Sequence, residues 1–294
     1  MFSKRLSLDT PRFYDLYATC HAHGWKNLLP FHWDDDNKLL QFTAYVAEMP
    51  VDFEASQSNA CVIVTLRSAK SLSVQQIEAA RSLVTRSLCL NIDTAPLLEI
   101  SKKVGPEYVR LIKMGAGRLL RAPTLWEDAA KTLFTTNCTW SLTTKMCESF
   151  CSDVFSKAAP SGVYPFPTAE KIARYSPKAL NKVSPVGYRS EYLIGLAKHF
   201  TKDPLLGSIE SNGLDYEVAD AVVRKIKGFG DYATAHMLIL AGYYDKVPID
   251  TVVVAYLKEN HRVRKPQSFI DRHYRKWGKY KWWGLKLENY LTTS

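Results

Sequence analysis

The chain has 294 residues, of which 46% are hydrophobic, and it contains seven Trp and sixteen Tyr. This composition excludes wholesale disorder, and the length favours two compact units that share an interface. The 39 Lys and Arg residues exceed the 29 Asp and Glu residues and give a formal charge of +10, which attracts nucleic acid first and an anionic membrane second.

Residues 1–105 are expected to form an α+β unit around an antiparallel sheet. Apolar or alternating runs at 39–49 and 60–68 have the pattern of strands. Polar segments interrupt these runs at 34–37, 54–59 and 68–71.

A helix is predicted over residues 73–88, directly after the strand runs. Ser73 can cap its first turn, and Ile77, Ala80, Leu83 and Val84 recur at helical spacing on one apolar face. We expect this face to cover the sheet.

From residue 106 the pattern changes to helices separated by Pro, Gly and Ser, so 106–294 is predicted to be a helical domain. The expected fold class is therefore mostly α, with an N-terminal α+β part.

The sequence gives little evidence for a membrane protein or for a metal site. The sequence has neither an apolar run of about eighteen residues nor an apolar leader, which favours a soluble, intracellular protein. The six cysteines lack the paired spacing of metal sites and are expected to be reduced packing residues, so no metal site is predicted. We expect the protein to act as a monomer.

The segment 222–242 carries a helix, a tight Gly228-Phe229-Gly230 hairpin and a second helix. Glycines permit positive φ and close backbone approach, and free N–H groups at the start of the second helix can hold a phosphate. This helix-hairpin-helix predicts contact with a DNA backbone, although such a hairpin can also be a simple helix C-cap.

Asp250 follows Pro248 at the start of another helix. A carboxylate there can act on a substrate, or it can serve as an N-cap, and both roles can coexist.

The hairpin together with Pro248-Ile249-Asp250 resembles the helix-hairpin-helix (HhH-GPD) superfamily of base-excision DNA glycosylases, in its alkylpurine and 8-oxoguanine branch. In that family a Gly-x-Gly hairpin is followed about twenty residues later by an essential aspartate. The resemblance spans the chain from about Gly117 to Leu291. It implies that Asp250 is catalytic and that the partner is double-stranded DNA containing a damaged base.

The resemblance also assigns DNA contacts. The segment 131–150 resembles the family helix whose Asn fills the gap left by a flipped base, which implies this role for Asn137, and 186–197 resembles the segment that kinks the duplex. A capping Asn, a helix-start Tyr and a surface Arg are the plain alternatives. The DNA-contacting residues expected are Asn137, Tyr188, Arg189, Lys227, Gly228 and Gly230.

Bifunctional members carry a Schiff-base lysine two residues after the second glycine, where this chain has Tyr232. Tyrosine forms no imine, so water is the expected nucleophile and the enzyme is predicted to be monofunctional, without AP-lyase activity. The aromatic ring resembles the alkylpurine branch and favours alkylated purines. The base pocket is expected to contain Tyr232, with His236 on the same helix face, and Trp283 from the segment 277–284.

Two alternatives stay open: a glycosylase for 8-oxoguanine or deaminated bases, and a non-catalytic DNA-binding protein. No organic cofactor is expected, because the nucleotide-binding glycine motifs are lacking. A monovalent cation held by the hairpin carbonyls, as in some relatives, is compatible with the resemblance.

Overall fold

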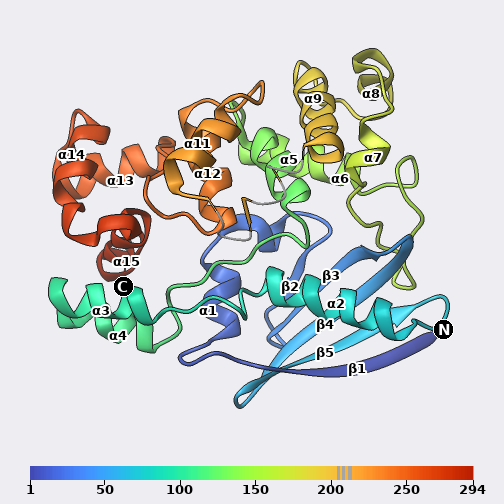
Figure 1. Ribbon diagram of the computed structural model, residues 1–294, viewed down its shortest axis with the longest axis horizontal. Coiled ribbons are helices and arrows are strands. Elements are labelled where there is room, and N and C mark those ends of the chain that lie inside the picture. Colours follow the sequence, from blue (N-terminus) through green and yellow to red (C-terminus); the bar gives the residue numbers. More distant parts are fainter. Residues whose placement is uncertain (204–205, 207–208, 211–213, 294) are drawn as a thin grey trace.

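The computed structural model describes residues 1–203, 206, 209–210 and 214–293. A five-stranded sheet lies at one side of the molecule and the helices are stacked above and beside it (Figure 1). The N-terminal elements are β1 (Phe2–Asp9), α1 (Leu16–His21), η1 (Gly24–Asn27), β2 (His32–Asp34), β3 (Leu39–Val46), β4 (Met49–Ser58), β5 (Cys61–Ser68) and α2 (Val74–Ser87).

The helices that follow form the larger part of the chain. They are α3 (Ala95–Val104), α4 (Pro106–Lys113), α5 (Leu125–Thr135), α6 (Trp140–Phe150), α7 (Ala169–Ile172), α8 (Pro177–Val183), α9 (Arg189–Lys202), α11 (Tyr216–Arg224), α12 (Asp231–Ala241), α13 (Thr251–His261), α14 (Pro266–His273), η2 (Arg275–Tyr280) and α15 (Lys281–Thr293). The predicted fold class is confirmed.

The sheet is antiparallel with strand order β1-β5-β4-β3-β2. The expected break at 54–59 is wrong, because residues 54–58 continue β4 and only the turn at Asn59 ends it. β4 is hydrogen-bonded on both sides, with Ala55 opposite Leu40 and Val64. This pairing holds polar residues in the strand despite their low strand propensity.

Helix α2 confirms the prediction over 73–88 and packs on the sheet (Figure 1). Ser73 and Gln76 form a capping box, in which the Ser73 hydroxyl accepts from the Gln76 N–H at 3.2 Å and the Gln76 side chain accepts from the Ser73 N–H at 2.9 Å.

Helices α5 and α12 pack against each other at the centre of the helical part, and Ala233–Ala241 of α12 is buried throughout. The expected domain boundary at 105/106 falls between α3 and α4, which pack together beneath α15 (Figure 1). One hydrophobic core cluster includes residues from both parts.

A buried carboxylate ties the two parts together. Asp128 of α5 accepts hydrogen bonds from the Trp25 indole at 2.7 Å and the Ala122 N–H at 2.9 Å, and it pairs with Arg86 of α2 at 2.8 Å. Burial raises the pKa of Asp128 and Arg86 opposes that shift. Removing one partner would therefore leave a costly buried charge.

Within the described part of the chain, no helix combines the length and the apolar character needed to cross a bilayer.

Candidate functional site

The helix-hairpin-helix lies where the sequence predicts it, with α11 and α12 joined by the glycine hairpin. Gly228 has φ +99°, and a Cβ there would lie 2.8 Å from Tyr192 Cδ2 and 3.0 Å from Leu133 Cδ2. Glycine is therefore required both by conformation and by close packing. The Thr234 hydroxyl donates to the Phe229 carbonyl at 3.2 Å.

Gly230 differs from Gly228, because a Cβ at Gly230 would meet nothing within 4 Å. It is the N-cap of α12 and no side chain caps the N–H groups of that first turn. These groups can therefore donate to an anion that approaches the hairpin.

A cleft of about 1420 Å³ opens beside the hairpin. Its basic groups come from both sides of the cleft, with Lys225 and Lys227 before the hairpin and Lys258 on α13. Lys227 pairs with Glu191 at 2.9 Å, but its side chain remains 69% exposed. Of the predicted site residues, the cleft brings together Asn137, Tyr188, Lys227, Gly228, Gly230, Tyr232 and Asp250.

Asp250 is the N-cap of α13 and its side chain accepts from the Val253 N–H at 2.8 Å. The capping role and a position in the cleft thus coexist, because only one carboxylate oxygen makes this bond. The bond fixes the carboxylate at the N-terminus of α13, on the lining of the cleft.

Tyr232 begins a row of buried rings that leads from the cleft into the molecule. Its ring is stacked on His236 with a centroid distance of 5.5 Å, and its hydroxyl lies 3.2 Å from the Thr135 hydroxyl. His236 does not line the cleft itself, because it lies behind Tyr232 and is only 6% exposed.

His236 meets a second histidine, which the sequence analysis did not single out. Its Nε2 lies 2.9 Å from Nε2 of His23, which precedes η1 in the N-terminal part. Burial lowers the pKa of His236 to about 4 and holds that of His23 well below its usual value. Both rings are therefore neutral at pH 7, and one donates while the other accepts.

Lys286 of α15 is the other residue that the sequence analysis missed. Burial lowers its pKa, and the nearby Asp250 carboxylate opposes that shift. The charge of Lys286 also contributes to the lowered pKa of His23, so this ammonium group lies within electrostatic reach of both residues. Its Nζ is 5.1 Å from the centre of the Tyr290 ring. Lys286 and Asp250 are 36 positions apart in the sequence, and the residues between them give no signal for this approach.

Asn137 lies in the turn between α5 and α6 and not on a helix, so the single helix expected over 131–150 is wrong. Its φ of +48° is left-handed, a region that Asn tolerates better than most residues. Thr139 then caps α6 by accepting from the Leu142 N–H at 3.3 Å. The side chain of Asn137 is exposed at the cleft.

Arg189 does not face the cleft, in contrast to the expectation that it contacts DNA. It is 4% exposed and donates to the Leu133 carbonyl at 3.1 Å and to the Thr136 carbonyl. The guanidinium thus donates to two carbonyls at the end of α5 and holds the turn that carries Asn137. The Leu133 carbonyl also accepts from the Thr136 hydroxyl at 2.7 Å. Its neighbour Tyr188 is 52% exposed at the cleft, under the Arg189 guanidinium at 4.7 Å.

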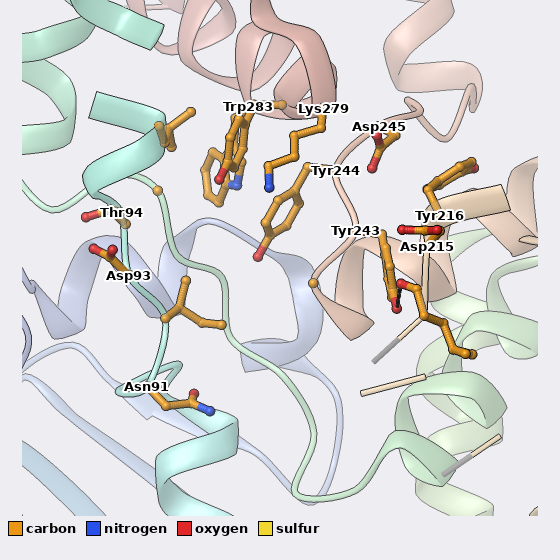
Figure 2. A pocket seen from close by; sticks show the side chains of 16 residues that line it. Asn91, Asp93, Thr94, Asp215, Tyr216, Tyr243, Tyr244, Asp245, Lys279 and Trp283 are labelled. Atoms are coloured by element: carbon orange, nitrogen blue, oxygen red, sulfur yellow. Dashed lines mark hydrogen bonds between the residues drawn. The ribbon is translucent and has the colours of Figure 1, made fainter. Parts of the chain in front are cut away.

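Trp283 also lies elsewhere than expected. It is fully buried and lines a second pocket of about 580 Å³, beside Tyr244 and Lys279 (Figure 2). Its ring meets that of Tyr244 edge-on at 5.7 Å. Trp283 is not among the residues that line the cleft of Asp250, because it packs inward from α15.

The comparisons with known proteins agree with this architecture. The profile of the HhH-GPD superfamily base excision DNA repair protein matches residues 130–279, a little over half of the chain. A search of curated protein sequences gives no match.

Solved structures share the fold over nearly the whole chain. The 3-methyladenine DNA glycosylase from Archaeoglobus fulgidus is similar with a TM-score of 0.74 and 17% identity, covering 97% of this chain and 98% of that one. The 8-oxoguanine glycosylase/lyase of Clostridium acetobutylicum, in complex with DNA, gives a TM-score of 0.69 and 16% identity, covering 100% and 99%.

Proposed function

Because the chain belongs to the HhH-GPD superfamily of base excision DNA repair proteins, we propose that it is a monofunctional DNA glycosylase that removes an alkylated purine from duplex DNA. The observation that carries this proposal is the position of the Asp250 carboxylate in one cleft with the hairpin and Tyr232. In a protein that only bound DNA, this carboxylate would serve only as the helix cap of α13.

Cleavage of the N-glycosidic bond builds positive charge on the deoxyribose, and a carboxylate beside C1′ stabilises it. The Asp250 carboxylate supplies the stabilising negative charge, and it orients or deprotonates a water molecule. The water oxygen bonds to C1′, the base leaves with the electron pair of the broken bond, and an abasic site remains. The Tyr232 hydroxyl offers no amine for a covalent intermediate.

The remaining residues of the cleft provide a grip on DNA. The uncapped first turn of α12 and the exposed Lys227 can hold phosphates, while Tyr188 and Asn137 stand at the edge where a flipped base would leave the duplex. The electron-rich Tyr232 ring suits a cationic methylated purine, since a cation is attracted to an aromatic face.

The proposal is tested with duplexes that each carry one lesion: 3-methyladenine, 7-methylguanine, 8-oxoguanine, hypoxanthine or uracil. We expect release of an alkylated base, strand breaks only after alkali, and loss of release in Asp250→Asn with DNA binding retained. Asp245→Asn is the matched control, because this carboxylate lines the second pocket. If wild type binds DNA but releases no base, the protein is a binding module instead.

One observation favours a second candidate, a glycosylase/lyase for a neutral lesion such as 8-oxoguanine. The buried amine of Lys286 has a lowered pKa and lies within electrostatic reach of Asp250. In this candidate the Lys286 nitrogen bonds to C1′ as the base leaves, which requires its side chain to reach a cleft that it does not line. Loss of the amine protons and opening of the sugar ring would then give an imine, from which β-elimination breaks the strand.

Borohydride reduction separates the two candidates, since it converts an imine into a stable protein–DNA adduct. The monofunctional proposal predicts no adduct and predicts that Lys286→Arg, which keeps the charge, retains base release. An adduct in wild type that is lost in Lys286→Arg would establish the second candidate.

A further inference from the structure

Three helices near the C-terminus bring two histidines and a glutamate together. His261 ends α13, His273 ends α14, and Glu288 lies in α15. His261 Nε2 is 2.7 Å from Glu288 Oε1, and His273 Nε2 is 3.2 Å from Glu288 Oε2. One ligand atom from each residue lies within 4.8 Å of the other two.

The contact between His261 and Glu288 brings a ring nitrogen and a carboxylate oxygen to 2.7 Å. Despite the 2.7 Å separation, the buried His261 Nε2 has no aligned hydrogen-bond partner. A buried ring nitrogen without a well-aligned hydrogen bond costs stability unless another partner satisfies it. A shared ligand at the centre of the cluster would satisfy all three side chains.

The donor set and spacing suit a transition-metal ion. Zinc binds imidazole nitrogen and carboxylate oxygen at about 2.0–2.2 Å, which places tetrahedral ligand atoms roughly 3.4 Å apart. The spacings of 2.7 and 3.2 Å are shorter than this value and involve different oxygens of Glu288, whereas one ligand atom from each residue lies within 4.8 Å of the others, so the side chains must rotate to surround one ion. The Phe269 ring stacks on His273 at 4.7 Å and packs against His261 at 4.8 Å, which restricts both imidazoles.

We propose that His261, His273 and Glu288 bind one divalent transition-metal ion of the zinc type. His273 is 40% exposed, so the fourth position opens to solvent and is taken by water. This site departs from the expectation of no metal, because that expectation rested on the spacing of the cysteines. The two histidines are twelve positions apart in the sequence, and Glu288 follows His273 by fifteen positions.

The ion would be structural and not part of base release. Asp250 lies at the other end of α13, eleven residues from His261, which corresponds to roughly 16 Å along the helix axis. Metal binding would instead join the ends of α13 and α14 to α15. It would thereby fix the helix that carries Asp250 against the helix that carries Lys286.

The test uses the full-length protein, stripped of metal with a chelator and titrated with zinc chloride against a chromophoric competitor. We expect one zinc per chain, and a melting temperature that rises by roughly 5 °C at a hundredfold excess over the dissociation constant. His261→Ala and His273→Ala should each weaken binding at least tenfold. His199→Ala is the control, since this exposed histidine lies on α9.

Cobalt(II) provides a readout that does not depend on any variant folding. Wild type loaded with cobalt should show the intense visible absorption of a low-symmetry four-coordinate site, and zinc should displace it. The proposal is overturned if wild type gives no such band and binds no stoichiometric zinc. It is also overturned if the His261→Ala/His273→Ala double variant, folded by circular dichroism, binds zinc as tightly as wild type does.

Discussion

Acidification should destabilise the protein through the buried pair of His23 and His236. The pKa of His236 is about 4 in the folded state and about 6.5 in an unfolded chain. Between these values the unfolded chain binds more protons, so the free energy of unfolding falls as pH falls. From pH 7 to pH 5 the linkage relation gives a loss of about 2 kcal/mol from His236 alone.

Urea denaturation at the two pH values, followed by tryptophan fluorescence, measures this loss. The control is His236→Gln, which keeps a polar side chain behind Tyr232 but removes the titrating ring. We expect wild type to lose about 2 kcal/mol more than the variant between pH 7 and pH 5. Equal losses in the two proteins would refute the assignment of a neutral, buried His236.

Three further substitutions have defined outcomes. Gly228→Ala should destabilise the fold by about 1–3 kcal/mol in urea denaturation, because its φ is positive and Tyr192 blocks the Cβ, whereas Gly230→Ala should leave stability nearly unchanged. The latter should still weaken duplex binding in a fluorescence titration if phosphate approaches there. Arg189→Met should cost about 1–3 kcal/mol in the same denaturation assay, because the Thr136 carbonyl loses its donor and the Leu133 carbonyl loses one of its donors. Trp283→Phe should leave kcat/KM for base release unchanged at temperatures where the variant is folded, since this ring lies outside the cleft.

The order of the elements could be read from the sequence because each rests on local information. The Ser73 cap and the glycine at position 228 act within a few residues, and both were predicted correctly. The contribution of Gln76 to the cap and the open space around Gly230 were not predicted. The sequence analysis wrongly assigned the polar residues 54–58 to a break between strands. Their place in β4 depends on pairing with two neighbouring strands, which a local sequence pattern does not show.

The sequence analysis identified only those parts of the candidate site that lie in or near the helix-hairpin-helix motif. Tyr232 lies in the hairpin segment, Asp250 follows Tyr232 by eighteen residues at the start of α13, and both line the cleft. Arg189 was misjudged because a charged residue is usually exposed, whereas here the carbonyls of a distant helix end bury it. His23 and Lys286 come from opposite ends of the chain, and neither lies in a motif that predicts its position near the site.

This arrangement makes the interior behind the cleft depend on packing between distant parts of the chain. His23 reaches His236 only because the N-terminal part is fixed to the helices, a task shared by the Asp128 contacts with Trp25 and Arg86. A substitution that loosens this junction would therefore change the surroundings of Tyr232 without touching the cleft. If the base is bound against Tyr232, such a substitution should impair base release more than duplex binding, because the backbone grip of the hairpin lies within the helical part alone.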